Sequence, residues 1–380
     1  MATIGVIREM APAERRVALT PEVTARLADS GLKVLAETRA GERAGFPDAA
    51  YAGAGAAIVT PADLYARADV VVGVSAPGGE LRPGQLILGL LDPLTHPSRT
   101  GAWARQGVTA VSLDLLPRTL SRAQPMDALT SQASVAGYKA VLVAANTYAG
   151  YFPMLITAAG TVKPATVLVL GAGVAGLHAI GTARRLGAVV TGYDVRPEAR
   201  AEVLSVGARF LEPGGAVEAG GAGGYARELT SAERQDQQRA LDERIPAFDV
   251  VITTAAVPGR RPPLLVTETA LARMRTGSVV VDTAAGPLGG NVALSRPDTT
   301  VTVPPGVLVV GAGNLPSAMP AAASAAYARN VQAALTLLLP DGEPHLDMSD
   351  ELQAAMVVCR DGELRNDVVR ALLDREEDRP

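Results

Sequence analysis

The chain has 380 residues, which is long enough for two domains that each have a full core. Its formal net charge of −4 argues against a nucleic-acid or anionic-membrane surface, and its single cysteine, Cys359, excludes an internal disulfide or a cysteine metal cluster. There is no run of about 18 uninterrupted apolar residues and no signal-peptide pattern at the start. We therefore expect a soluble protein of the reducing cytoplasm, without direct membrane insertion.

Residues 1 to about 114 alternate short apolar runs with amphipathic stretches, which predicts an α/β domain with a mostly parallel sheet. The expected strands are 4–7, 33–36, 56–58, 69–74, 85–91 and 108–113, and the expected helices are 21–30, 48–52, 61–66 and 97–106. No glycine-rich turn follows the first strand. This domain is therefore not predicted to hold a nucleotide.

The pattern changes between residues 115 and 151. A polar loop is followed by a predicted helix of about 20 residues, 127–147, which we expect to connect two domains. Residues 152–164 are expected to form the turn into the second domain.

A glycine motif opens the second domain. An apolar strand, 166–170, leads into Gly171, Gly173 and Gly176 at G-x-G-x-x-G spacing, and an apolar helix pattern runs on to residue 186. The first glycine allows a tight turn, the second lets a pyrophosphate approach the backbone, and the third allows close packing of helix and strand. The free N–H groups of the helix N-terminus favour phosphate. The order of these parts predicts a dinucleotide site, against the simpler interpretation of a structural glycine-rich turn.

A second apolar strand, 188–193, ends at Asp194, eighteen residues past Gly176. A carboxylate at this place can accept both hydroxyls of an adenosine ribose and repels a 2′-phosphate, so it favours NAD over NADP. Arg196 weakens that preference, unless it only caps the next helix or points to solvent.

The remaining elements continue the α/β alternation. We expect helices at 197–205, 227–244, 267–274 and 317–339, and strands at 208–211, 249–253, 278–282 and 307–310. Residues 214–224 form a glycine-rich segment that is either a functional loop or a tolerated insertion. The charged tail, 374–380, is predicted to be disordered.

Ordered segments along nearly the whole chain carry a family resemblance. They are R-E-x(5)-R-R-V-A-L-T-P from Arg8 to Pro21, PRTLSRAQPMDALTSQASVAGYKA from Pro117 to Ala140, the glycine motif, GGYARELT at 223–230, VITTAAVPGRRPPLLVT, GSVVVDTAAG, and GGN ending at Asn291. In these segments the chain resembles the NAD(H)-binding alpha subunits of proton-translocating NAD(P) transhydrogenases, which form a wider family with alanine dehydrogenase. We therefore expect two Rossmann-like, doubly wound parallel-sheet domains joined by long helices: residues 1–134 with 316–380, and residues 135–315.

The resemblance also implies residue roles. It places Arg118, Gln124, Asp127 and Thr130 around the nicotinamide, with Arg122 as the alternative to Arg118 because Thr119 and Leu120 stand where the usual pattern has one residue. Asp127 could also be a helix cap. Together with the motif, the resemblance implies cofactor contacts at Gly171, Gly173, Val174, Ala175, Gly176, Asp194, Val195, Arg196, Gly224, Tyr225, Thr254, Ala255 and Asn291, and no metal.

The implied activity is hydride transfer from NADH on this chain to NADP⁺ held by a partner subunit. Proton movement would occur in membrane-spanning subunits, and the chain would be a homodimer, peripheral on the inner face of the cell membrane. Transfer between two nicotinamides needs orientation and exclusion of water, with no general acid or base.

Two other functions remain open. An alanine dehydrogenase needs an arginine, a lysine and a histidine. Arg16 is present, but Gly73 falls where the lysine would be, and His96 lies a few residues beyond the expected histidine. His178, on the helix after the glycines, is expected to be packed. A non-catalytic NAD-binding sensor is the second alternative.

Overall fold

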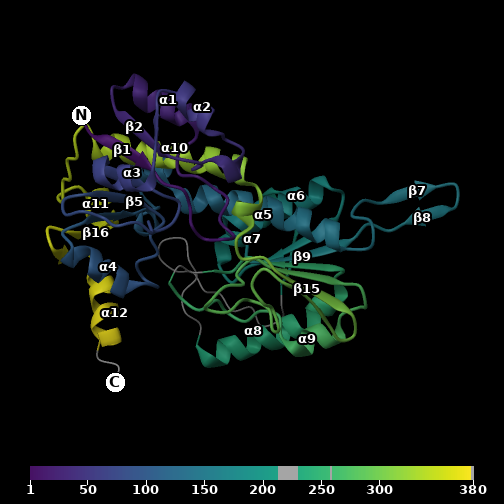
Figure 1. Cartoon of the computed structure of the whole chain (residues 1–380). Helices are drawn as coiled ribbons and strands as arrows, with labels where there is room; N and C mark the ends of the chain where they lie inside the picture. Colours follow the sequence, from purple (N-terminus) through teal and green to yellow (C-terminus); the bar gives the residue numbers. More distant parts are fainter. Residues whose placement is uncertain (213–229, 257–258, 378–380) are drawn as a thin grey trace. The chain divides into compact units, whose positions relative to one another are not determined.

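The computed structural model describes residues 1–212, 230–256 and 259–377 (Figure 1). The chain divides into two compact units. Unit 1 comprises Met1–Gln132 and Pro316–Pro380, and unit 2 comprises Ala133–Leu315. The whole of the predicted segment 214–224, and the start of the predicted helix at 227, lie outside the described residues.

An eight-stranded sheet forms the centre of unit 1, in the order β17-β16-β6-β5-β4-β1-β2-β3. Strands β1 to β6 are parallel and follow the order 3-2-1-4-5-6 of doubly wound folds, while β16 and β17 extend the β6 edge in antiparallel fashion. The strands are β1 Thr3–Val6, β2 Lys33–Glu37, β3 Ala57–Val59, β4 Val70–Val72, β5 Leu86–Gly89, β6 Thr109–Ser112, β16 Val357–Arg360 and β17 Glu363–Leu364.

Helices cover both faces of this sheet, and proline or threonine sets several of their starts. The helices are α1 Pro21–Asp29, α2 Asp48–Gly53, α3 Pro61–Arg67, α4 Pro97–Arg105, α10 Pro320–Leu338, α11 Glu351–Met356 and α12 Asp367–Glu377, and α5 Ala128–Thr147 spans the boundary between the units. The hydroxyls of Thr20 and Thr60 accept from backbone N–H groups in the first turns of α1 and α3.

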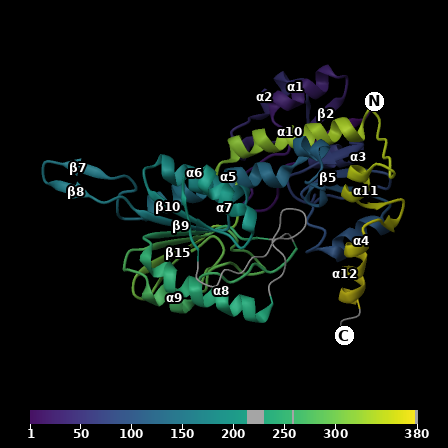
Figure 2. The same cartoon turned by 180° about the vertical axis from the view of Figure 1, so that it is seen from behind.

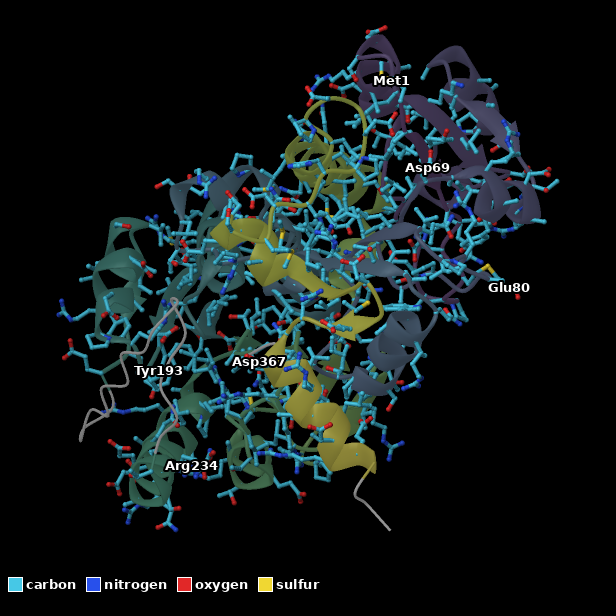
Figure 3. The ribbon with its side chains drawn as sticks, turned by 90° about the vertical axis from the view of Figure 1, so that its left-hand side faces the viewer. Met1, Asp69, Glu80, Tyr193, Arg234 and Asp367 are labelled. Carbon is cyan, nitrogen blue, oxygen red and sulfur yellow. The ribbon has the colours of Figure 1, made fainter. Side chains whose placement is uncertain are left out.

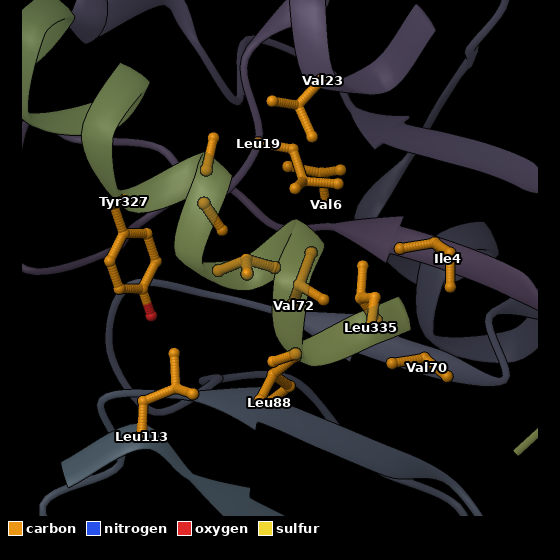
Figure 4. Close-up of a cluster of buried hydrophobic side chains, with 14 of the residues drawn as sticks. Ile4, Val6, Leu19, Val23, Val70, Val72, Leu88, Leu113, Tyr327 and Leu335 are labelled. Carbon is orange, nitrogen blue, oxygen red and sulfur yellow. The ribbon is translucent and has the colours of Figure 1, made fainter. Parts of the chain in front are cut away.

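The larger core of unit 1 lies between the sheet and α10 (Figure 4). Ile4 and Val72 point from the strands toward Leu335 of α10, and Tyr327 is fully buried with its hydroxyl donating to the Gly73 carbonyl at 2.9 Å. Burial of each large apolar side chain is worth roughly 1.5–3 kcal/mol, so α10 is held mainly by packing.

A buried carboxyl group closes the loop after β1. Glu9 is 4% exposed, and its Oε1 accepts from the Val74 backbone N–H at 2.6 Å while Oε2 accepts from the Ser75 hydroxyl. Burial raises the pKa of this carboxyl from 4.5 to about 7, against the lowering effect of the Ser75 and Val74 hydrogen bonds. Glu9 therefore joins the segment after β1 to the segment after β4.

A seven-stranded sheet forms the centre of unit 2, in the order β11-β10-β9-β12-β13-β15-β14. Its first six strands are parallel and repeat the order 3-2-1-4-5-6, which confirms the predicted pair of Rossmann-like, doubly wound sheets. The strands are β9 Thr166–Leu170, β10 Val189–Tyr193, β11 Arg209–Phe210, β12 Val250–Thr253, β13 Val279–Asp282, β14 Thr300–Val303 and β15 Val307–Gly311.

Alternate residues of β9 enter different cores, as expected for a strand buried on both faces. The helices of unit 2 include α6 Val174–Arg185, α7 Pro197–Ser205, α8 Ser231–Arg244 and α9 Glu268–Arg273. Val167 and Val169 pack with α5, α6 and α7, whereas Leu168 and Leu170 pack with α8 and α9. Tyr193, labelled in Figure 3, ends β10, and its hydroxyl accepts from Gln237 of α8 at 3.1 Å.

Several segments differ from the sequence predictions. Residues 152–164, expected to be a turn, contain a hairpin of β7 Leu155–Thr157 and β8 Gly160–Val162 that projects from unit 2 (Figures 1 and 2). Strand β14 was not predicted and pairs antiparallel with β15. The tail predicted to be disordered from 374 is helical to Glu377, because α12 begins at Asp367 (Figure 3) and packs Leu373 beside Gly101 of α4.

The raised pKa of Glu9 predicts how the stability of unit 1 depends on pH. The folded state keeps the Glu9 proton to a higher pH than the unfolded state, so this group's contribution is lost as the pH rises from about 4.5 through 7. Glu9→Gln removes that loss. We expect the variant's advantage over the wild type to grow by about 3 kcal/mol across this range.

Urea unfolding followed by the fluorescence of Trp103, the only tryptophan and a residue of unit 1, measures the effect. The control is Glu22→Gln at an exposed carboxylate of α1, which should show no such gain with pH. Parallel pH profiles for Glu9→Gln and the wild type would contradict the prediction.

Candidate functional site

The glycine loop between β9 and α6 leaves no space for side chains at its first and third glycines. Gly171 has φ +99°, and a Cβ there would meet the Thr254 hydroxyl at 2.7 Å. A Cβ on Gly176 would lie 1.9 Å from the Gly171 carbonyl oxygen. The fold itself therefore requires glycine at both positions: Gly171 for the turn, and Gly176 for the close contact of α6 with the end of the strand.

At Gly173, by contrast, no contact within the protein requires glycine. Its φ of −73° suits any residue, it is exposed, and a Cβ built on it meets nothing within 4 Å. It is the N-cap of α6, ahead of Val174 and Ala175, so the free N–H groups of the first helical turn lie beside open space. The arrangement suits the close approach of an anionic group such as a pyrophosphate.

Asp194 comes directly after β10 and lies close to this loop. Its side chain is 10% exposed, and Oδ2 accepts from the Ala172 backbone N–H at 2.7 Å. Oδ1 accepts from the Arg196 backbone N–H at 2.9 Å. The guanidinium of Arg196 also pairs with both oxygens, at 3.2 and 3.3 Å, and does not point to solvent. Val195 is partly buried against the core of unit 2.

The loops after β12 and β13 complete this end of the sheet. The Thr254 hydroxyl donates to the Gly171 carbonyl at 2.9 Å, and the Ala255 N–H donates to Oδ1 of Asn291 at 3.2 Å. Nδ2 of Asn291 donates to the Ala255 and Pro263 carbonyls, both at 2.8 Å, and the residue is fully buried. The Asn291 side chain thus holds the Ala255 loop in place.

Two residues of this region were not singled out in the sequence. Asp282 is fully buried at the end of β13 and accepts from the backbone N–H of Asn291 at 3.2 Å, and a Cβ on Gly290 would meet its carboxylate at 2.1 Å. Gly137 of α5 lets that helix approach the first turn of α6, since a Cβ there would lie 2.0 Å from the Ala175 carbonyl. Asp282 could have been found in the sequence, because it is an acidic residue at the end of an apolar strand. Gly137 could not, because it lies inside an uninterrupted helix pattern.

The four residues expected around the nicotinamide belong to unit 1. Asp127 caps α5: its Oδ1 accepts from the Thr130 N–H at 2.9 Å and its Oδ2 from the Thr130 hydroxyl at 2.6 Å. Gln124 is exposed and Arg118 half-buried. Arg122 pairs with Asp350 at 2.9 Å.

A buried amide anchors this loop. Nδ2 of Asn330, on α10, donates to the Pro125 carbonyl at 2.8 Å, and its Oδ1 accepts from the Ser131 hydroxyl at 2.7 Å. The loop that carries Gln124 is therefore fixed at its base although its outer side chains are exposed. No motif in the sequence pointed to Asn330.

The arginine and histidine positions weighed for an alanine dehydrogenase have other partners. Arg16 pairs bidentately with Glu14, at 2.8 and 2.6 Å, and donates to Gln132 at 2.8 Å. His96 lies 3.2 Å from Asp92, with both side chains about half exposed. His178 is exposed, contrary to the expectation that it is packed, because it lies on the outer face of α6.

A Cβ at Gly73, the place of the dehydrogenase lysine, would meet the Ser75 carbonyl at 2.6 Å. Gly224 and Tyr225 lie outside the described residues. Within 1–212, 230–256 and 259–377 no cluster of three or more metal-ligating side chains occurs. None of the helices in those ranges combines the length and apolar character that crossing a bilayer requires.

Comparison with known proteins gives matches over both units. The family model described as alanine dehydrogenase/PNT, N-terminal domain, matches residues 5–136, and the C-terminal domain model matches residues 140–367. The NAD(P) transhydrogenase subunit alpha of Cereibacter sphaeroides is 43% identical over 368 residues, covering 94% of this chain and 70% of that protein.

An alanine dehydrogenase of Mycolicibacterium smegmatis is 30% identical over 384 residues, covering 98% of this chain and 96% of that one. Among solved structures, the transhydrogenase of Sinorhizobium meliloti has a TM-score of 0.82 and 37% identity, covering 95% of this chain and 98% of that chain.

The contrast between Gly173 and Gly176 gives a matched pair of variants. Gly176→Ala should lower the free energy of unfolding by roughly 3 kcal/mol, because its methyl group collides with a backbone carbonyl. Gly173→Ala should lower it by about 1 kcal/mol or less, the cost of alanine at an N-cap, yet weaken NADH binding at least about tenfold. Thermal unfolding by circular dichroism and calorimetric titration with NADH measure the two effects. Unchanged NADH binding by Gly173→Ala would show that no phosphate approaches there.

Proposed function

Because the chain belongs to the alanine dehydrogenase/PNT family, we propose that it is the NAD(H)-binding subunit of a proton-translocating NAD(P) transhydrogenase. The observation that carries the proposal is the open backbone at Gly173, beside Asp194 and the N-terminus of α6. A structural turn has no need of glycine at that position, whereas a bound pyrophosphate does.

The residues of unit 2 act by binding and orientation. The N–H groups at the start of α6 hold the pyrophosphate, and Asp194 accepts the hydroxyls of the adenosine ribose. The Thr254 hydroxyl ties the loop after β12 to the Gly171 carbonyl, and Asn291 holds the same loop at Ala255. These two contacts fix the wall of the site. Gly224 and Tyr225 are also proposed to contact the nucleotide.

The residues of unit 1 orient the reacting ring. NADH, when bound, would supply the hydride that NADP⁺ on the partner subunit accepts. Arg118 and Gln124 are suited to a carboxamide and a ribose, while Asp127 and Thr130 hold the start of α5 rigid and present a carboxylate. Since no proton is exchanged in this step, the residues need only position the ring and exclude water.

Proton translocation is assigned to separate membrane-spanning subunits, and this chain is peripheral on the inner face of the membrane through them. That division is in keeping with the relatives' designation as subunits. The NADP(H)-binding subunit docks and detaches during turnover.

The hairpin supports the proposal of a homodimer. In the described residues β7 and β8 pair with no third strand, and an isolated two-stranded sheet is only marginally stable in water. Ile156 is 75% exposed and Met154 is 56% exposed. A second copy would cover both side chains with an identical surface, as two-fold symmetry requires.

Alanine dehydrogenase activity is the second candidate, favoured by the Mycolicibacterium smegmatis relative. It is the weaker one. A substrate carboxylate at Arg16 would have to displace Glu14, and the backbone at Gly73 leaves no room for a lysine side chain. A non-catalytic sensor is the third, and only an activity assay separates it from a subunit that needs its partner.

The assay is hydride transfer from NADH to NADP⁺ by the purified chain, alone and with an NADP(H)-binding transhydrogenase subunit. We expect turnover only in the mixture, and a loss of about tenfold or more for Gln124→Asn and Asp127→Asn. Asparagine retains the helix cap, so stability should change little. Reduction of NAD⁺ by alanine would favour the dehydrogenase, and NADH binding without turnover in the mixture would favour the sensor.

A second variant tests the homodimer. Ile156→Asp places a charge on the exposed face of the hairpin, and we expect it to shift the chain from dimer to monomer in light scattering after gel filtration. Val368→Asp, at a 59% exposed valine of α12, is the matched control and should leave the dimer intact. A wild-type monomer at micromolar concentration would refute the proposal.

A further inference from the structure

The ion pair between Asp194 and Arg196 engages both oxygens of the carboxylate. The Ala172 and Arg196 backbone N–H groups donate to one oxygen each, at 2.7 and 2.9 Å. The Nε and Nη2 atoms of Arg196 donate to the same two oxygens, at 3.2 and 3.3 Å. These four donors match the roughly four lone-pair positions of a carboxylate.

The two backbone donors belong to the fold and stay in place when a ligand binds. The guanidinium is on a flexible side chain and can leave. Two ribose hydroxyls are also donors, so they compete with Nε and Nη2 for the same lone pairs. Glu202 of α7 lies 3.9 Å from Nη2 and offers the departing guanidinium a second carboxylate.

We propose that Arg196 is a specificity-determining residue of this site: its guanidinium competes with the ribose diol for Asp194, and it is the group that would receive a 2′-phosphate if Asp194 were absent. The inference rests on the proposed binding of NAD(H) in unit 2. Asp194 and Arg196 would then together determine whether the site prefers NADH or NADPH.

The pair, rather than the acid alone, sets the charge that a 2′-phosphate would meet. Asp194 repels the phosphate, and while Asp194 holds the guanidinium, that cation is not available to the ligand. Both side chains are largely buried, at 10% and 15% exposure, so screening by salt is weak. Removing either partner therefore changes the preference in a defined direction.

Calorimetric titration of the full chain with NADH and with NADPH tests the inference. Arg196→Ala should bind NADH about fivefold more tightly than the wild type, since the competing donor is gone, and should still reject NADPH. Asp194→Ser should lose most NADH affinity and gain measurable NADPH affinity. The double variant should lose that gain, because the new phosphate contact requires Arg196.

Arg200→Ala is the matched control. Arg200 is exposed on α7, the helix that follows Arg196, and it pairs with Glu212 at 2.9 Å. Its loss changes the net charge by the same amount as the loss of Arg196 but leaves the contacts of Asp194 in place. Circular dichroism of each variant checks folding. Arg196→Lys keeps the positive charge but loses the paired hydrogen bonds of the guanidinium, and it alters the size of the side chain less than Arg196→Ala does.

The outcomes distinguish failure of the inference about Arg196 from failure of the proposed NAD(H) binding. If the wild type binds NADH but Arg196→Ala binds it equally or more weakly, Arg196 assists the ribose and the inference is overturned while the proposed function stands. NADPH binding by Asp194→Ser that persists in the double variant overturns it as well. A wild type that binds no NADH overturns both.

Discussion

The contact between the first turn of α6 and the carbonyl oxygen of Gly171 is the constraint on which the site in unit 2 depends. No side chain fits at Gly176, because its Cβ would lie 1.9 Å from that oxygen. The same oxygen accepts the Thr254 hydroxyl, so one backbone atom locates both α6 and the loop after β12. The helix N-terminus is thereby held at the carboxyl end of the sheet, where an anion can reach its N–H groups.

The two units share a strand order and differ in the residues that follow their first strand. In unit 2 the glycine loop leaves open space beside the backbone at Gly173. In unit 1 the carboxyl group of Glu9 accepts hydrogen bonds from Val74 and Ser75 after the neighbouring strand. The shared fold therefore does not by itself decide what each unit can bind; the residues at the ends of its strands do.

Local patterns predicted most elements, because a buried parallel strand and an amphipathic helix each leave a periodic signal. The predictions failed where that signal is short or ambiguous. The hairpin at 155–162 has strands of only three residues, and β14 alternates threonine and valine beside two prolines. Helix α12 was obscured by its charged end, although its apolar residues pack on α4.

By itself the sequence determined the strand–glycine–helix–strand–acid order, since each part is a property of consecutive residues. Tertiary structure decided what those residues touch. It paired Asp194 with Ala172 and with the guanidinium of Arg196 and placed Gly137 against Ala175. It also joined Arg16 to Glu14 and Gln132. Hydrogen bonds and close contacts depend on distances of a few ångströms between atoms that the chain brings together only when it folds, and no periodicity in the sequence records them.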